Sequence, residues 1–144
     1  MILVVDDEEA YRELLARIVT KAGYEAVQAA DGFEALSLLP KSKIDLVISD
    51  ILMPGMNGYA LVARIRAKWP SMPVILTTGY LSKDAAKNMM NGSVDFIPKP
   101  IDFETLITMI NGHVCASSQV QQRQLYSADA LSFRSPQMGE MKKL

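Results

Sequence analysis

Short runs of apolar, mostly β-branched residues alternate along this chain with longer stretches in which apolar residues recur at helical spacing. The first run, Ile2 to Val5, and two later runs are almost continuously apolar, as expected for strands covered on both faces. This alternation is typical of βαβ units and a parallel sheet. Five strands are predicted, at residues 2–5, 26–29, 45–49, 73–77 and 94–97.

The stretches between these runs predict helices. After the first run, apolar residues three and four apart form one stripe that would face the sheet: Tyr11, Leu14, Leu15, Ile18 and Val19. Similar patterns, ended by glycine or proline, predict helices at 8–22, 32–39, 57–68, 82–91 and from residue 102 onward. The fold class is therefore α/β, a doubly wound (βα)₅ arrangement.

Composition narrows the class of protein. The chain has 144 residues, about the size of one domain, and no apolar run approaches the roughly 18 residues of a membrane-spanning helix. A net charge of −1 provides no overall field to attract nucleic acid or an anionic membrane. The first residues do not form a secretion signal, and one cysteine with one histidine cannot form an internal disulfide or a zinc site. We expect a cytoplasmic protein that contacts neither membrane nor nucleic acid.

The composition changes after Gly112. Residues 113–124 are rich in Ser and Gln, as in a linker or a polar extension of the last helix. Gly112 permits a helix break but does not require one, because an interior glycine costs only about 1 kcal/mol. We therefore predict a domain at 1–112, a linker or helix extension at 113–128 and a tail at 129–144. His113 is interpreted as part of a solvated helix end.

Polar residues follow four of the five predicted strands. In an open parallel sheet, ligands bind outside the carboxyl ends of the strands, so these residues converge. A single aspartate there, such as Asp7, could merely cap a helix. Three carboxylates together repel one another by about 4 kcal/mol per pair at about 4 Å, which predicts a cation among them. Oxygen ligands without nearby His or Cys favour Mg²⁺, or Mn²⁺. The residues at this edge are Asp6, Asp7, Asp50, Thr78, Gly79 and Lys99.

Four stretches at this edge carry a resemblance to a known family. They are Val4 to Glu8, Asp50 to Gly58, Pro73 to Gly79 and Phe96 to Pro100. Together they resemble the receiver domain of two-component response regulators over residues 1–112. The resemblance implies a CheY-like, flavodoxin-like fold with strand order 2-1-3-4-5.

The resemblance also implies a role for each carboxylate. Asp50 would be the phosphoacceptor, a carboxylate nucleophile that takes a phosphoryl group from a sensor histidine kinase. Asp7, Asp50 and the backbone carbonyl of Leu52 would bind Mg²⁺, and Asp6 would act mainly through a water molecule.

Further residues would bind the phosphoryl group and respond to it. Lys99 and the Thr78 hydroxyl would contact its oxygens, and Gly79 would leave room for it. A cis Lys99–Pro100 bond would aim the lysine inward. Phe96, which on periodicity alone would be a core aromatic, matches the family's switch aromatic and would move with Thr78.

Two other function classes are alternatives to a phosphorylation-activated signalling switch. A phosphohydrolase of the haloacid-dehalogenase type needs Asp-x-Asp after its first strand, whereas this chain has Asp6-Asp7-Glu8 and no cap domain. A silent, receiver-like binding module is disfavoured because all the pocket residues are present. The implied role is information transfer and not that of an enzyme, apart from the domain's own phosphorylation and dephosphorylation.

The last residues of the sequence bear on the response that such a switch would control. Residues 133–144 are similar to the opening segment of the AAA+ module of NtrC-type, sigma-54-dependent activators, although no Walker motif follows. A stand-alone CheY-like receiver and a surface tail are the alternatives. The face formed by the fourth helix, fifth strand and fifth helix is expected to relay the signal and to form a homodimer in one phosphorylation state. Its apolar residues from the fifth helix, expected to be only partly used by the core, are Phe103, Leu106, Ile107 and Ile110.

Overall fold

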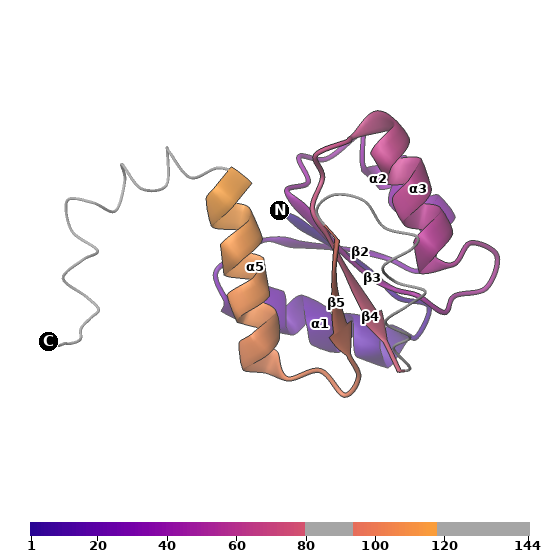
Figure 1. Ribbon diagram of the computed structural model, residues 1–144. Helices are drawn as coiled ribbons and strands as arrows, with labels where there is room; N and C mark the ends of the chain where they lie inside the picture. Colours follow the sequence, from indigo (N-terminus) through magenta and orange to yellow (C-terminus); the bar gives the residue numbers. More distant parts are fainter. Residues whose placement is uncertain (80–93, 118–144) are drawn as a thin grey trace, which may run out of the picture. The chain divides into compact units, whose positions relative to one another are not determined.

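The computed structural model describes residues 1–79 and 94–117 and contains a five-stranded parallel sheet in the order β2-β1-β3-β4-β5 (Figure 1). Both the α/β class and the strand order implied by the resemblance are confirmed. Three strands end one residue later than predicted, so that Asp50 and Thr78 are the last residues of their strands. The strands are β1 (Ile2–Val5), β2 (Ala26–Ala29), β3 (Leu46–Asp50), β4 (Val74–Thr78) and β5 (Val94–Pro98).

Helices cover both faces of the sheet. Helix α1 (Glu9–Lys21) and helix α5 (Phe103–Ser117) lie on one face, whereas α2 (Gly32–Leu38) and α3 (Gly58–Lys68) lie on the other (Figure 1). The helix predicted at 82–91 falls outside the residues that the structure describes. By its internal contacts the chain divides into two units, Met1–Asn111 and Gly112–Leu144.

The three central strands β1, β3 and β4 are buried because helices cover them on both sides. Alternate strand residues such as Leu3, Val47 and Leu76 form one cluster with α2 and α3. Their neighbours Ile2 and Ile48 are equally buried and, since strand side chains alternate, point to the opposite face. This two-sided burial explains the continuous apolar runs in the sequence.

Two helices begin with side-chain caps that place them at the functional edge of the sheet. The carboxylate of Asp31 accepts a hydrogen bond from the Glu34 backbone N–H at 2.7 Å at the start of α2. The Asn57 side chain does the same for Ala60 at 2.8 Å at the start of α3. Each cap satisfies a backbone N–H that has no partner within the helix.

The apolar stripe of α1 is narrower than predicted. Leu15, Ile18 and Val19 are buried, but Leu14 is 38% exposed. Leu14 lies one position, about 100° around the helix, from Leu15, which carries it out of the contact with the sheet. The expectation that Leu14 faces the sheet was therefore wrong.

The apolar residues of α5 are also distributed differently from expectation. Leu106 and Ile110 are completely buried in the core, so they offer nothing to an external face. Of the four residues predicted for this face, Phe103, 46% exposed, and the half-buried Ile107 remain accessible. Helical spacing identified these residues as one face but did not show that the sheet covers most of it.

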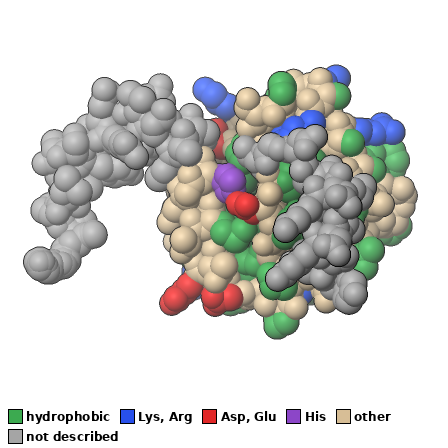
Figure 2. Space-filling model, in the orientation of Figure 1, with side chains coloured by type: hydrophobic (Ala, Val, Ile, Leu, Met, Phe, Trp, Pro, Cys, Tyr) green, Lys and Arg blue, Asp and Glu red, His purple; other side chains and the backbone are tan. Residues whose placement is uncertain are grey.

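Helix α5 continues through Gly112 to Ser117, so the glycine does not break it. Residues 118–144 lie outside the described part, and the predicted boundaries of linker and tail stay predictions. No helix within residues 1–79 and 94–117 is long and apolar enough to cross a membrane. Charged side chains of both signs are scattered over the face drawn in Figure 2.

Candidate functional site

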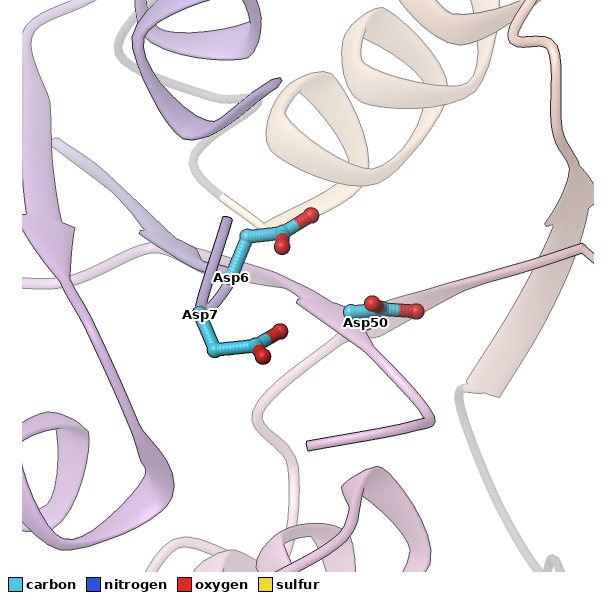
Figure 3. A group of neighbouring side chains, drawn as sticks. All are labelled: Asp6, Asp7 and Asp50. Carbon is cyan, nitrogen blue, oxygen red and sulfur yellow. The ribbon is translucent and has the colours of Figure 1, made fainter. Parts of the chain in front are cut away.

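Three carboxylates meet at the carboxyl ends of β1 and β3. Val5 pairs with Ser49 in the sheet, so Asp6 and Asp50, each one residue further along, lie side by side. Carboxylate oxygens of Asp6, Asp7 and Asp50 all lie within 4.8 Å of one another, and the side chains extend in the same direction (Figure 3). The structure thus brings together the three acids that the sequence singled out.

Asp6 is the most deeply buried of the three and is only partly satisfied. Its Oδ1 atom accepts the backbone N–H of Glu8 at 2.9 Å. Its Oδ2 atom is buried and has no hydrogen-bond partner in the part of the chain that the structure describes. Burial raises the pKa of Asp6, although the Glu8 N–H and the Lys99 ammonium act in the opposite direction.

Lys99 reaches the carboxylates from the end of β5. Its Nζ atom donates to Asp50 Oδ2 at 3.3 Å and lies 3.5 Å from Asp6 Oδ2. Although burial acts to lower it, the pKa of Lys99 is raised by the Asp6 and Asp50 carboxylates. The lysine is therefore a permanent positive charge beside Asp50. The Lys99–Pro100 peptide bond is cis, as the resemblance implied.

The donor set fits a hard divalent cation. Lys99 balances one of the three carboxylates, which leaves two negative charges when all are ionised. The Asp6 Oδ2 atom is buried, forms no hydrogen bond among the described residues and is an ion-pair partner of Lys99, so it could also bind a cation. Carboxylate oxygens are the ligands that Mg²⁺ prefers. Leu52 has an exposed side chain, and the role of its carbonyl stays a prediction.

The residues expected to respond to phosphorylation lie on β4 and β5. Thr78 is buried at the end of β4 and pairs with Pro98. Phe96 is half-buried, pairs with Leu76 and packs against the core cluster shared with α2 and α3. A Cβ atom at Gly79 would meet none of the described atoms within 4 Å. The switching roles of Thr78 and Phe96 stay predictions.

Gly58 supports Asp50 from the start of α3, a role that the sequence pattern did not indicate. Its N–H donates to the Ile51 carbonyl at 2.8 Å. A Cβ atom there would lie 2.6 Å from the Asp50 carbonyl oxygen and 2.8 Å from Ile51 Cα. Only glycine lets α3 approach the end of β3, which carries Asp50, this closely.

Two residues of α1 were also missed. The Tyr11 ring centroid lies 4.3 Å from Lys99 Nζ. Arg12 donates from Nη1 to the Asp6 carbonyl oxygen at 2.9 Å and from Nε to Gln28 Oε1 at 3.1 Å. The available signal was their place in the first turn of a helix that directly follows the Asp pair.

Comparison with known proteins agrees with this geometry. Residues 2–111 match the response regulator receiver domain family. The DNA-binding transcriptional regulator NtrC of Klebsiella pneumoniae is 34% identical over 120 residues, which cover 83% of this chain and 26% of NtrC. The transcriptional regulatory protein GlrR of Escherichia coli is 36% identical over 138 residues, 95% of this chain and 31% of GlrR. The chain thus spans about a quarter to a third of these relatives.

A solved structure confirms the likeness in three dimensions. The Vibrio cholerae chemotaxis protein CheY4 superposes with a TM-score of 0.71 at 32% identity, covering 78% of this chain and 96% of that one.

Proposed function

Since this chain belongs to the response regulator receiver domain family, we propose that it is a phosphorylation-activated switch in which Asp50 accepts a phosphoryl group from a sensor histidine kinase. One observation carries the proposal. Asp50 is the carboxylate that is both within 4.8 Å of the Asp6 and Asp7 ligand oxygens and hydrogen-bonded to Lys99. It therefore lies where a transferred phosphoryl group would meet positive charge.

The transfer consists of one displacement at phosphorus. A carboxylate oxygen of Asp50 forms a bond to the phosphorus of a phosphohistidine, while the bond from phosphorus to the imidazole nitrogen breaks and leaves its electron pair on that nitrogen. Lys99 binds a phosphoryl oxygen, and the Thr78 hydroxyl binds another. The protein contributes position and charge more than acid–base chemistry.

Asp7, Asp50 and the Leu52 carbonyl would hold Mg²⁺, or Mn²⁺, and Asp6 would act mainly through a bound water molecule. When bound, the ion would offset the repulsion between the incoming phosphoryl group and the carboxylates. Lys99 would offset part of the same repulsion, because its ammonium already lies between Asp6 and Asp50.

The switch would couple the carboxylate site to β5 and α5. Thr78, drawn toward a phosphoryl oxygen, leaves space into which the apolar ring of Phe96 moves at little desolvation cost. The face formed by β5 and α5 then changes shape and pairs with a second copy in one phosphorylation state.

The output we propose is transcription regulation. The match to the transcriptional regulatory protein GlrR extends over 138 residues, well beyond the receiver region at 2–111. The segment Arg134-Ser135-Pro136, similar to the start of an AAA+ module, lies in this additional region. A stand-alone receiver that acts by protein contacts is the alternative. The cytoplasmic location expected from the sequence stays a prediction.

Labelling with a small phosphodonor tests the proposal. With acetyl phosphate and Mg²⁺, the wild type should take up one phosphoryl group and Asp50→Asn none, because the amide keeps the shape but is not a nucleophile. Asp31→Asn is the matched control, since it changes an aspartate that caps α2 and asparagine caps equally well. Equal labelling of Asp50→Asn and wild type would refute the assignment.

A further inference from the structure

Among the described residues, two carboxylates and one aromatic ring lie close to the Lys99 ammonium. Asp50 Oδ2 lies 3.3 Å away, Asp6 Oδ2 lies 3.5 Å away, and the Tyr11 ring centroid lies 4.3 Å away. Only 21% of the Lys99 side chain is exposed. The ring is thus one of the contacts that limit where the ammonium can go.

Tyr11 itself is fixed close to the acidic cluster. It belongs to the first turn of α1, and the next residue, Arg12, binds both the Asp6 carbonyl oxygen and the Gln28 side chain on β2. The Asp6 N–H in turn donates to Ala29 at the end of β2. The segment that carries the carboxylates therefore also sets the position of the ring.

An aromatic face attracts a cation through its quadrupole without neutralising it. Carboxylates alone would let the lysine ammonium move between Asp6 and Asp50, since each of them attracts it. The ring favours the arrangement in which the ammonium stays beside Asp50.

We propose that Tyr11 is a positioning residue that holds the Lys99 ammonium beside Asp50 through a cation–π contact and thereby speeds phosphorylation of Asp50. The inference rests on the proposed phosphoacceptor role of Asp50. It adds a group that does not touch the phosphoryl donor and acts through Lys99.

The contact has a spectroscopic signature that a merely structural role would not produce. Ring current should move the Lys99 ε-methylene proton resonances upfield in the metal-free protein. Tyr11→Phe keeps the ring and should keep this shift, whereas Tyr11→Leu keeps an apolar side chain without a ring and should abolish it. Lys99→Arg identifies the resonances by their disappearance.

The functional consequence is measured with acetyl phosphate, which needs no docking surface for a kinase. Tyr11→Leu should slow phosphorylation about two- to fivefold, the range of a partly exposed cation–π contact. Tyr11→Phe should react at the wild-type rate, and Mg²⁺ affinity should be the same in all three proteins. Leu14→Ala, which changes an exposed residue of the same helix, is the control and should have no effect.

Each outcome decides the proposal. A Tyr11→Leu protein that reacts like wild type, or a Tyr11→Phe protein that is as slow as Tyr11→Leu, overturns it, as does the absence of a ring-current shift in wild type. If wild type is labelled normally and only these comparisons fail, the role of Tyr11 is wrong and the phosphoacceptor role stands. If wild type takes up no phosphoryl group, the proposed function fails and the kinetic role of Tyr11 fails with it.

Discussion

At the scale of single residues, the site is defined by three carboxylates that only one lysine balances among the described residues. The sequence was sufficient to find Asp6, Asp7, Asp50 and Lys99, because each follows a recognisable strand and parallel strands end at one edge. It predicted a cation among the acids but did not predict that the Lys99 ammonium supplies part of the positive charge there. The contact of Tyr11 could not be predicted either, because helical spacing assigned it to the core stripe.

Asp6→Asn should stabilise the metal-free protein and weaken Mg²⁺ binding. Burial raises the pKa of Asp6 even with the Lys99 ammonium 3.5 Å from its Oδ2 atom, so the Asp6 charge destabilises the folded metal-free protein. Removing its charge should raise the melting temperature without metal. Calorimetry and thermal unfolding measure both effects.

The exposed neighbour is the control for this prediction. Asp7→Asn should also weaken Mg²⁺ binding but leave the stability of the metal-free protein nearly unchanged, since Asp7 is solvated. Equal melting temperatures for wild type and Asp6→Asn without metal would contradict the account of Asp6.

Mg²⁺ binding should weaken as the pH falls, starting above the ordinary range of an aspartate. Burial raises the pKa of Asp6 in the folded protein, so protons compete with the ion at a higher pH than at a solvated carboxylate. The same raised pKa makes the metal-free protein more stable as the pH falls through it toward the unfolded value. Titrations with Mg²⁺ at several pH values, with Asp6→Asn for comparison, measure the difference. An identical pH dependence in both proteins would contradict the claim that protonation of Asp6 weakens Mg²⁺ binding.

At the scale of elements, burial on both faces made the strands easy to predict. The ends predicted for the first three helices from the apolar pattern and from glycine and proline lie within one residue of the observed ends of α1, α2 and α3. Periodicity shows which side of a helix is apolar but not how much of that side the sheet covers. For this reason Leu14 was assigned to the core, and Leu106 and Ile110 were assigned to an accessible face.

Gly58→Ala should destabilise the fold by about 1–3 kcal/mol, since its Cβ atom would overlap the Asp50 carbonyl and the Ile51 backbone. The rate of phosphorylation should fall as well, because the displaced backbone carries the nucleophile. Denaturant unfolding and acetyl phosphate labelling measure the two effects.

Gly112→Ala is the matched substitution within α5. Its Cβ atom meets no described atom within 4 Å, and alanine is a better helix former by about 1 kcal/mol, so this variant should be more stable than wild type. If Gly58→Ala were as stable as Gly112→Ala, this would contradict the claim that the close approach of α3 to β3 requires glycine at position 58.

At the scale of the whole molecule, the order β2-β1-β3-β4-β5 places the pocket and the proposed output face on adjoining strands. β4 ends at Thr78 in the pocket, and β5 carries both Phe96 and the segment leading to Lys99. The sequence indicated this arrangement through the resemblance and not through its hydrophobic pattern alone, because periodicity does not determine strand order.

A phosphoryl mimic should change the balance between monomer and dimer. A ligand shifts an equilibrium only by its different affinities for the two states, so beryllofluoride with Mg²⁺ must favour one assembly. Phe103, 46% exposed, is an accessible apolar residue of α5, and Phe103→Ser should weaken the dimer without changing the acidic cluster. Sedimentation at several concentrations checks this, and identical distributions with and without the mimic would contradict the dimer.

The most direct test of the central claim is to locate the phosphoryl group. Wild-type protein is incubated with acetyl phosphate and Mg²⁺, the acyl phosphate is trapped by borohydride reduction, and the altered residue is identified by peptide mass spectrometry. The account predicts a single altered position, Asp50, which Asp50→Asn abolishes. Modification at another residue, or at none while the protein is folded and Mg²⁺ is bound, would contradict it.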